Sequence, residues 1–196
     1  MKRNIKYWMV GLVILFVITG GGKAFATVQT FKDVAPSYWA YVPIEWGAEN
    51  GVIRGYPDGT FRATEPLEEV HIVRIVANAI NDGHLVIDGE DASSYEYYQW
   101  MRDQGVPLGD FENRDHHVTR GEMAVILVSA LQREPKTLEE AVDYLFEKGI
   151  TDGFYTTGSM MERYAPEKTL TRAQAMVFMM RVYENMPVTP VVESIR

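Results

Sequence analysis

Gly-Tyr-Pro-Asp-Gly-Thr-Phe at residues 55–61 is the most informative stretch of this sequence. Pro57 fixes its own φ and Gly59 readily adopts the left-handed conformation, so Pro-Asp-Gly predicts a tight turn. Phe61 follows the turn directly, and we expect it to fold back as an apolar plug. The stretch therefore predicts a structured loop, and its flanking sequences indicate what the loop connects.

An aromatic residue five positions before a glycine occurs three times along the chain. The three pairs are Trp46 and Gly51, Trp100 and Gly105, and Tyr144 and Gly149. Each glycine ends a short helical pattern, at the position where a helix needs a residue with positive φ. The sequence therefore predicts three short helices, whose aromatic residues we place in the core.

Capping boxes mark the starts of several helices. They are Ser93-x-x-Glu96 and Thr137-x-x-Glu140 before two of the short helices, and Thr119-x-x-Glu122 and Thr171-x-x-Gln174 before apolar stretches further along. Apolar residues in these second stretches recur with a period of 3.6, which is typical of helices. The shared faces are Leu67, Val70, Val73, Ile75 and Ala79; Met123, Ile126, Leu127 and Leu131; and Ala175, Met179, Val182 and Tyr183.

The chain thus contains a helix-loop-helix unit of about fifty residues three times. We expect unit 1 at residues 27–80, unit 2 at 81–134, unit 3 at 135–186 and a C-terminal tail at 187–196. The segment 81–94 is rich in Asp, Gly and Ser and predicts a surface loop. One unit cannot bury its apolar face alone, so we expect the three to stack into one body.

Residues 1–26 have the pattern of a signal peptide. Lys2, Arg3 and Lys6 precede an apolar run, and Ala24-Phe25-Ala26 supplies a cleavage site, so we expect the mature chain to start at Thr27. The apolar run is short for a membrane span, and we expect no stable span after cleavage, with an uncleaved N-terminal anchor as the alternative. The sequence contains no cysteine, which excludes disulfide bonds and lipoprotein attachment.

The mature chain is strongly acidic. The whole chain has a net charge of −8, and removal of the leader with its four basic residues leaves 15 basic against 27 acidic residues, or −12. Such a surface repels nucleic acid and anionic membranes at long range, so we exclude a nucleic-acid partner. An anionic ligand must therefore be bound by a few local cations.

These motifs resemble the S-layer homology family. The family's unit begins Phe-x-Asp-Val, continues to Trp-Ala and Gly-Tyr-Pro-Asp-Gly-Thr-Phe, and closes with Thr-Arg-Ala-Glu at a helix start. Unit 1 matches the first three elements at residues 31–34, 39–40 and 55–61, whereas units 2 and 3 match the last at residues 119–122 and 171–174. The resemblance implies a mainly α fold, with three repeats packed as a pseudo-threefold body around a central three-helix bundle.

The resemblance also implies a function. Members of the family bind a secondary cell-wall polysaccharide, often one with a pyruvyl ketal, in grooves between neighbouring repeats. It implies a secreted, non-catalytic protein of the Gram-positive cell wall and S-layer, without cofactor or metal. The polysaccharide-binding residues that it indicates are Asp33, Trp39, Gly55, Tyr56, Arg120 and Arg172. Chemically, a guanidinium can bind a carboxylate through two parallel hydrogen bonds, and a Trp face can carry a sugar ring.

The sequence departs from the family pattern at the start of the second helix of unit 1. Leu67-Glu68-Glu69-Val70-His71 stands there, so Glu69 occupies the arginine position. We hypothesise that one groove remains fully equipped, with Asp33, Trp39 and an arginine from a neighbouring unit, either Arg120 or Arg172. The alternative function is an envelope protein–protein interaction or assembly module that keeps the fold with little carbohydrate affinity.

Structural interpretations of the same residues remain open. Trp39 fits the core as well as a groove, and Asp33 fits a turn in which it accepts only backbone hydrogen bonds. His116-His117 with Asp110, Asp115 and Glu122 is the nearest pattern to a metal site, but its spacing favours a solvated loop. The sequence lacks the nucleophile and phosphate-loop motifs of common enzymes, and a glycosidase carboxylate pair is the remaining enzymatic alternative.

Overall fold

The computed structural model describes residues 29–81, 86–87 and 90–186, so the predicted signal peptide and C-terminal tail lie outside the described residues. The described part is mainly helical, which confirms the predicted fold class. Its elements are α1 (Tyr41–Glu49), α2 (Glu69–Ile80), β1 (Val86–Ile87), β2 (Glu90–Asp91), α3 (Ser94–Asp103), the 3₁₀ turn η1 (Phe111–Asn113), α4 (Arg120–Gln132), α5 (Leu138–Glu147), α6 (Met160–Tyr164) and α7 (Arg172–Asn185).

The predicted helix ends agree with the structure. All four predicted capping boxes are present, with hydrogen bonds in both directions between the N-cap and the third residue. The three predicted terminating glycines have φ values of 68°, 83° and 67°. Phe61 is fully buried and its ring packs against Phe31, as expected of the plug.

Three sequence predictions need correction. Residues 86–87 and 90–91 form a short antiparallel pair, β1 with β2, within the segment that we expected to be loop only. The helix α6 was missed, although Ser159 and Glu162 form a fifth capping box at its start. Tyr183, predicted on the apolar face of α7, is 59% exposed and contacts the ring of Trp46 instead.

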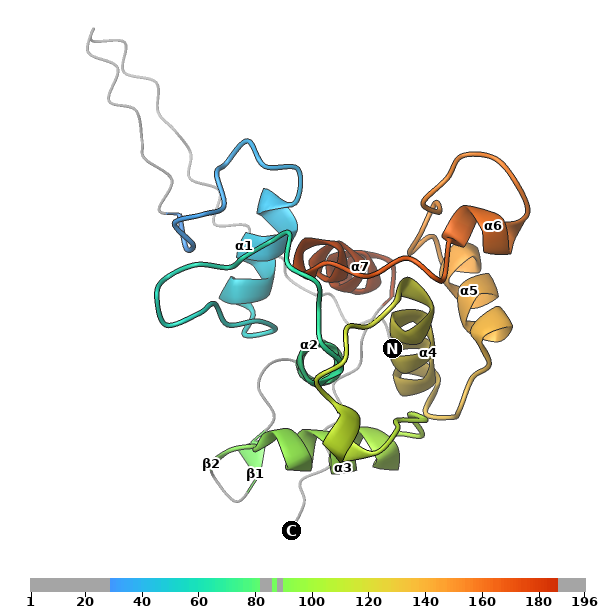
Figure 1. Ribbon diagram of the computed structural model, residues 1–196, viewed down its shortest axis with the longest axis horizontal. Coiled ribbons are helices and arrows are strands. Elements are labelled where there is room, and N and C mark those ends of the chain that lie inside the picture. Colours follow the sequence, from blue (N-terminus) through green and yellow to red (C-terminus); the bar gives the residue numbers. More distant parts are fainter. Residues whose placement is uncertain (1–28, 82–85, 88–89, 187–196) are drawn as a thin grey trace, which may run out of the picture.

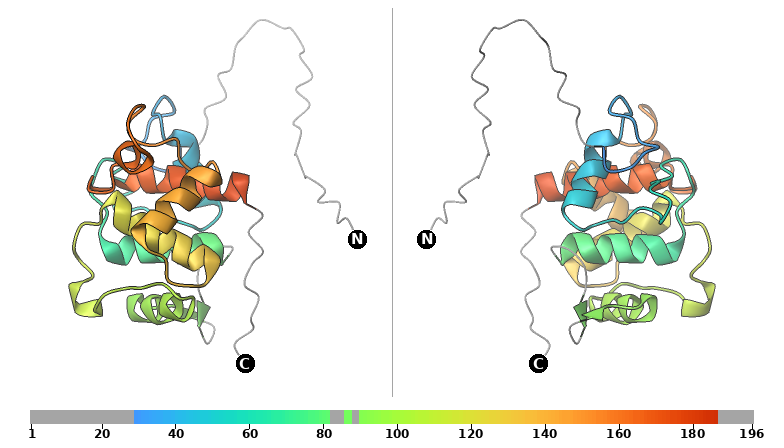
Figure 2. Two further views of the ribbon diagram at one scale, coloured as in Figure 1. Left: turned by 90° about the vertical axis from the view of Figure 1, so that its right-hand side faces the viewer. Right: turned by 90° about the vertical axis from the view of Figure 1, so that its left-hand side faces the viewer.

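The second helices lie in the middle of the molecule. Figure 1 shows α2, α4 and α7 there, with α1, α3 and α5 outside them. The outer helices pack on inner ones, α1 on α7, α3 on α2 and α5 on α4, and α2 packs against both α4 and α7. The side views of Figure 2 show α7 and α2 running in much the same direction. Each outer helix thus covers part of the inner group.

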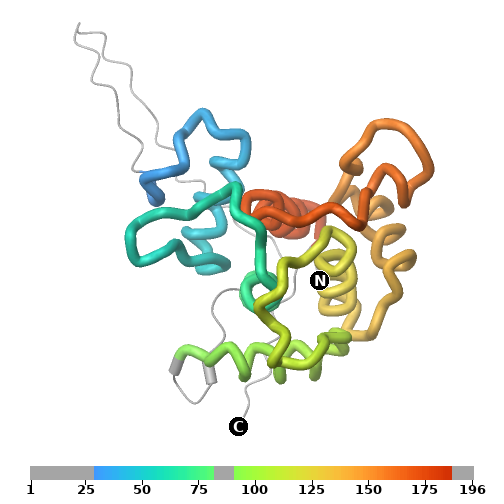
Figure 3. The backbone as a smooth tube through the Cα atoms, viewed as in Figure 1, coloured from blue at the N-terminus to red at the C-terminus, as the bar shows by residue number. Residues whose placement is uncertain are grey.

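A closed ring of three backbone hydrogen bonds joins the segments that lead into the inner helices. Leu67 N–H donates to Leu170 O, Leu170 N–H to Val118 O, and Val118 N–H to Leu67 O, at 2.8–2.9 Å. All three residues are fully buried. We interpret this ring as a threefold relation between the units, which Figure 3 shows following one another around the middle.

Candidate functional site

The first residue of each inner helix lies against the loop of the next unit. Glu69 N–H donates to His116 O, Arg120 N–H to Lys168 O, and Arg172 N–H to Glu65 O. Each inner helix begins two residues after a member of the buried ring, so Glu69, Arg120 and Arg172 are equivalent positions. The structure therefore agrees with the alignment that put Glu69 in the arginine position of unit 1.

Arg172 joins unit 3 to the informative loop of unit 1. Its Nε donates to the main-chain oxygen of Phe61 at 2.8 Å, and its guanidinium lies 4.7 Å from the Phe61 ring centre and 5.1 Å from that of Tyr56. The residue is only 5% exposed, and burial lowers the pKa of its guanidinium. Its terminal nitrogens make no hydrogen bond with a described residue, yet they are not sealed from solvent. They remain available to a ligand.

Arg120 makes the matching contact between units 2 and 3. Its Nε donates to Tyr164 O at 2.9 Å, and the Tyr164 hydroxyl donates back to Arg120 O at 2.7 Å. The guanidinium lies among the rings of Tyr164, Phe154 and Phe178. Arg120 thus faces the loop of unit 3 and not the loop that carries Asp33.

Of the other predicted site residues, Asp33 and Gly55 have clear structural roles. The Asp33 carboxylate accepts hydrogen bonds from Phe61 N–H at 2.7 Å and Arg62 N–H at 2.8 Å, as the turn interpretation predicts. A Cβ atom on Gly55 would lie 2.3 Å from the Phe31 ring and 2.8 Å from Thr60 O, so close packing requires glycine there.

Tyr56 and Trp39 differ in their surroundings. The Tyr56 ring lies between two guanidinium groups, with Arg62 at 3.8 Å and Arg172 at 5.1 Å from its centre. Trp39 is 61% exposed, beside Tyr38, which excludes the core interpretation. The structure thus brings Asp33, Tyr56 and Arg172 together around the backbone of Phe61. Trp39 stays a predicted carbohydrate contact.

A cavity of about 230 Å³, which we call the cationic cavity, lies next to Arg172. It is lined by Val52, Ile53, Arg54, His71, Arg74, Ile75, Asn78 and Arg172. Three arginines and one histidine therefore face it, and none of these described lining residues is acidic. Arg54 also forms an ion pair with Asp91 at 2.9 Å, and His71 lies 3.6 Å from Glu68. The cavity is a local concentration of positive charge on an acidic protein.

Sequence reasoning missed three of these cations, although a signal for two was present. His71, Arg74 and Asn78 follow one another at helical spacing along α2, beside its apolar face. Arg54 directly precedes the informative loop and showed no such pattern. That these residues meet Arg172 depends on the packing of α7 beside unit 1, which no local pattern reveals.

The equivalent position between units 1 and 2 holds a second cavity, of about 620 Å³. We call it the Glu69 cavity. Its lining includes Pro107 and Leu108, which correspond to Ile53 and Arg54, and Glu122 and Val125, which correspond to His71 and Arg74. Glu69 replaces the arginine. Two equivalent places in the molecule therefore carry opposite charge.

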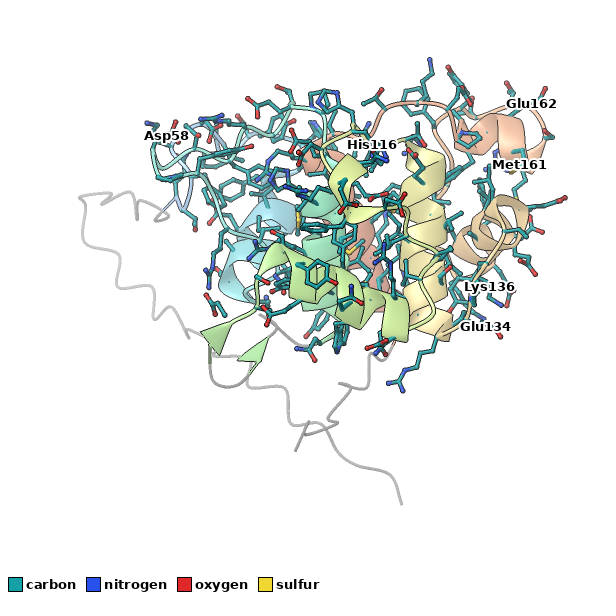
Figure 4. The ribbon with its side chains drawn as sticks, turned by 60° about the horizontal axis from the view of Figure 1, so that its bottom comes forward. Asp58, His116, Glu134, Lys136, Met161 and Glu162 are labelled. Atoms are coloured by element: carbon teal, nitrogen blue, oxygen red, sulfur yellow. The ribbon has the colours of Figure 1, made fainter. Side chains whose placement is uncertain are left out.

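Two members of the histidine cluster considered in the sequence, His116 and Glu122, line this second cavity. His116 Nε2 lies 3.4 Å from Glu122 Oε1 and 3.8 Å from Glu69 Oε2. Figure 4 shows His116 between the loop that carries Asp58 and the helix that carries Glu162. Within the described residues no group of three or more His, Asp and Glu side chains is arranged to hold a metal ion. No helix in the described ranges combines the length and apolar character that crossing a membrane requires.

Comparisons with known proteins agree with these features. The model of the S-layer homology domain family matches residues 30–67. The chain is 28% identical over 177 residues to S-layer protein EA1 of Bacillus anthracis, which covers 78% of this chain and 20% of that protein. It is 40% identical over 67 residues to the outer membrane protein SlpA of Thermus thermophilus, which covers 34% of this chain and 7% of that protein.

Residues 30–67 therefore match an S-layer homology domain, and the chain as a whole is similar to proteins of the cell surface. An S-layer protein of Bacillus licheniformis is also 28% identical over 177 residues. The chain spans a fifth or less of the length of these relatives.

Proposed function

We propose that this protein binds an acidic secondary cell-wall polysaccharide through the cationic cavity between units 3 and 1. Arg172 carries the proposal, because its guanidinium is held in place by the hydrogen bond to Phe61 O while its terminal nitrogens remain available. A guanidinium fixed in this way binds a carboxylate with two parallel hydrogen bonds and loses little conformational freedom in doing so.

The surrounding charges support an anionic ligand. Arg54 and Arg74 line the same cavity, and His71 adds a group that becomes cationic below its ordinary pH range, because burial lowers its pKa. Because the protein as a whole carries a net charge of −8, its long-range field does not attract anions. A cluster of cations at one place is the arrangement that such a protein needs to bind an acidic sugar.

Within this proposal the two predicted arginines have different roles. Arg172 contacts the ligand, together with Arg54 and Arg74. Arg120 makes the same backbone bond in its own interface, but it lies among aromatic rings and away from Asp33. Tyr56, next to Arg172, and the exposed Trp39 are the aromatic surfaces proposed to carry neighbouring sugar rings.

Co-sedimentation of residues 27–196 with purified bacterial wall sacculi tests this function. Binding that disappears when the secondary polymer is removed chemically from the sacculi supports the proposal. A folded protein that stays in the supernatant with several polymer-bearing walls overturns it. Binding that survives removal of the polymer also contradicts the proposal, because the ligand would then be another wall component.

A further inference from the structure

The Glu69 cavity has the wrong charge for an acidic polysaccharide. Glu69, Glu122 and Glu167 line it together with His116, whereas the cationic cavity is lined by Arg54, Arg74, Arg172 and His71. Carboxylates that face a carboxylate ligand repel it and oppose its binding. The cavity must therefore serve a different ligand from the one proposed above, or none.

Glu69 is the feature that points to a ligand. The residue is only 8% exposed, and its Oε1 accepts a 2.7 Å hydrogen bond from the buried Tyr98 hydroxyl. Its Oε2 accepts no hydrogen bond from a described residue and faces His116 at 3.8 Å. Like the terminal nitrogens of Arg172, this oxygen is not sealed from solvent. One of its oxygens is thus left for a donor in the cavity.

A second carboxylate faces the same point from another helix. Glu122 Oε1 lies 3.4 Å from His116 Nε2, while Glu122 Oε2 is occupied by the capping box with Thr119. The hydrogen bond to Asn113 O raises the pKa of His116, and the charges of Glu69 and Glu122 raise it further. The site between the two carboxylates therefore stabilises positive charge already.

The remaining walls are aliphatic. Leu108, Val125, Ile126 and Leu138 line the cavity together with two prolines. Aliphatic walls that lead to a carboxylate pair fit a hydrocarbon chain with a terminal cation. Apart from the His116 imidazole, no described residue in the lining offers an aromatic face on which a sugar ring could lie. The ligand chemistry that this arrangement favours is a primary alkylammonium group.

We propose that the Glu69 cavity binds a lysine side chain presented by a partner polypeptide, with its methylene groups along the Leu108, Val125 and Ile126 wall and its ammonium between Glu69 and Glu122. This site is separate from the cationic cavity, and it does not depend on polysaccharide binding. The protein would then hold a wall polymer through one inter-unit cavity and a protein partner through another.

The test uses two small probes that differ only in charge. N-acetyl-lysine methylamide carries the ammonium, and N-acetyl-norleucine methylamide has nearly the same hydrocarbon chain without it. NMR would follow the methyl groups of Leu108, Val125 and Ile126 and the imidazole of His116 during titration. We expect saturable shifts with the lysine probe and affinity at least about tenfold weaker for the norleucine probe.

Variants distinguish binding of the lysine probe in the cavity from nonspecific attraction of a cation to an acidic protein. Glu69→Gln keeps an oxygen for Tyr98, and Glu122→Gln keeps the capping box, because Gln174 forms the same box with Thr171. Each is expected to weaken the lysine probe about tenfold, whereas Glu139→Gln, an exposed position on α5, leaves its affinity unchanged. Circular dichroism confirms folding, and two independent variants keep the test valid if one of them unfolds.

Three results would overturn the proposal. They are the absence of saturable shifts with the lysine probe, equal affinities for the two probes, and equal effects of Glu139→Gln and Glu69→Gln. Glucosamine serves as a third probe. Saturable binding of glucosamine in preference to the lysine probe would mean that the cavity takes an amino sugar, and the proposed polypeptide partner would be wrong.

Discussion

Arg172 Nε donates a hydrogen bond of 2.8 Å to the main-chain oxygen of Phe61, a residue that precedes it by 111 positions. The Asp33 carboxylate binds the N–H of the same residue at 2.7 Å. The backbone of Phe61 is thus held from both sides by side chains that the family resemblance singled out as ligand contacts. Arg172 thus helps to build the site as well as to line it, whereas Asp33 supports the loop.

The variant Arg172→Lys separates the two roles of this arginine. We expect it to lower the free energy of unfolding by about 1–3 kcal/mol, because Phe61 O loses its buried donor. It should also weaken polymer binding at least about tenfold, since an ammonium cannot form two parallel hydrogen bonds. Urea unfolding measures the first quantity and calorimetric titration with released polymer the second.

Arg120→Lys is the matched control for this variant. It removes the equivalent bond to Tyr164 O, so we expect a similar loss of stability with little change in polymer binding. Equal losses of binding in the two variants would show that the interface between units 2 and 3 binds polymer as well. That result would contradict the proposal that Arg172, and not Arg120, contacts the polymer.

Gly55 and Gly109 occupy equivalent places and are predicted to differ in their tolerance of a methyl group. Gly55→Ala would place a Cβ atom against Phe31 and Thr60 O, whereas a Cβ on Gly109 meets nothing within 4 Å. We expect Gly55→Ala to destabilise the protein by about 1–3 kcal/mol, and Gly109→Ala to leave the thermal midpoint almost unchanged. A similar midpoint for both variants would show that Gly55 is not required for packing.

Glu69→Arg restores the arginine that the other two units carry. If the three inter-unit positions are equivalent, the variant should bind the acidic polymer more tightly than the parent protein, through a second anion-binding cavity. Calorimetric titration with released polymer would measure the gain in polymer affinity. A titration with the lysine probe should show that its affinity is lost. Unchanged polymer affinity in a folded variant would favour a role in protein–protein interaction for this part of the molecule.

His71 predicts the pH dependence of polymer binding. Burial lowers the pKa of His71, and the charges of Arg172 and Arg74 lower it further, while Glu68 and Asp115 act in the opposite direction. The imidazole is therefore neutral at pH 7 and gains charge only below its ordinary range. We therefore expect polymer binding to strengthen as the pH falls below 6.5, for as long as the sugar carboxylate stays ionised.

Protonation of His71 affects the stability of the ligand-free protein in the opposite direction from polymer binding. Because the folded pKa of His71 is depressed, the unfolded chain takes up its proton first, and the ligand-free protein loses stability as the pH falls below about 6.5. Substitution His71→Gln should remove both effects. A pH dependence of binding that is the same in the variant would exclude His71 as its source.

Local signals explain why much of the fold was predictable from the sequence. The box Thr171-x-x-Gln174 and the glycine at position 149 act within one turn of the chain, so each could be identified without knowledge of the packing. The burial of Phe61 was likewise predictable from the turn that precedes it. Even α6, which was not predicted, has such a signal in the capping box of Ser159 and Glu162.

The pairing of sites across units could not be predicted in this way. The sequence left open whether Arg120 or Arg172 joins the Asp33 loop, because that choice depends on which inner helix meets unit 1. The same holds for Arg54 and Arg74, which form a cationic cavity only once α7 lies beside them. Trp39 shows a related limit, since its large apolar area suited the core and the structure leaves it exposed.

The most direct test of the central claim is calorimetric titration of released secondary polymer into the double variant Arg54→Gln/Arg74→Gln. The control is Arg133→Gln/Lys148→Gln, which changes the net charge equally at two positions that do not line the cationic cavity. We predict affinity at least about tenfold weaker for the cavity variant and unchanged affinity for the control. Equal affinities in the two folded variants would contradict the claim that the cationic cavity binds the polymer.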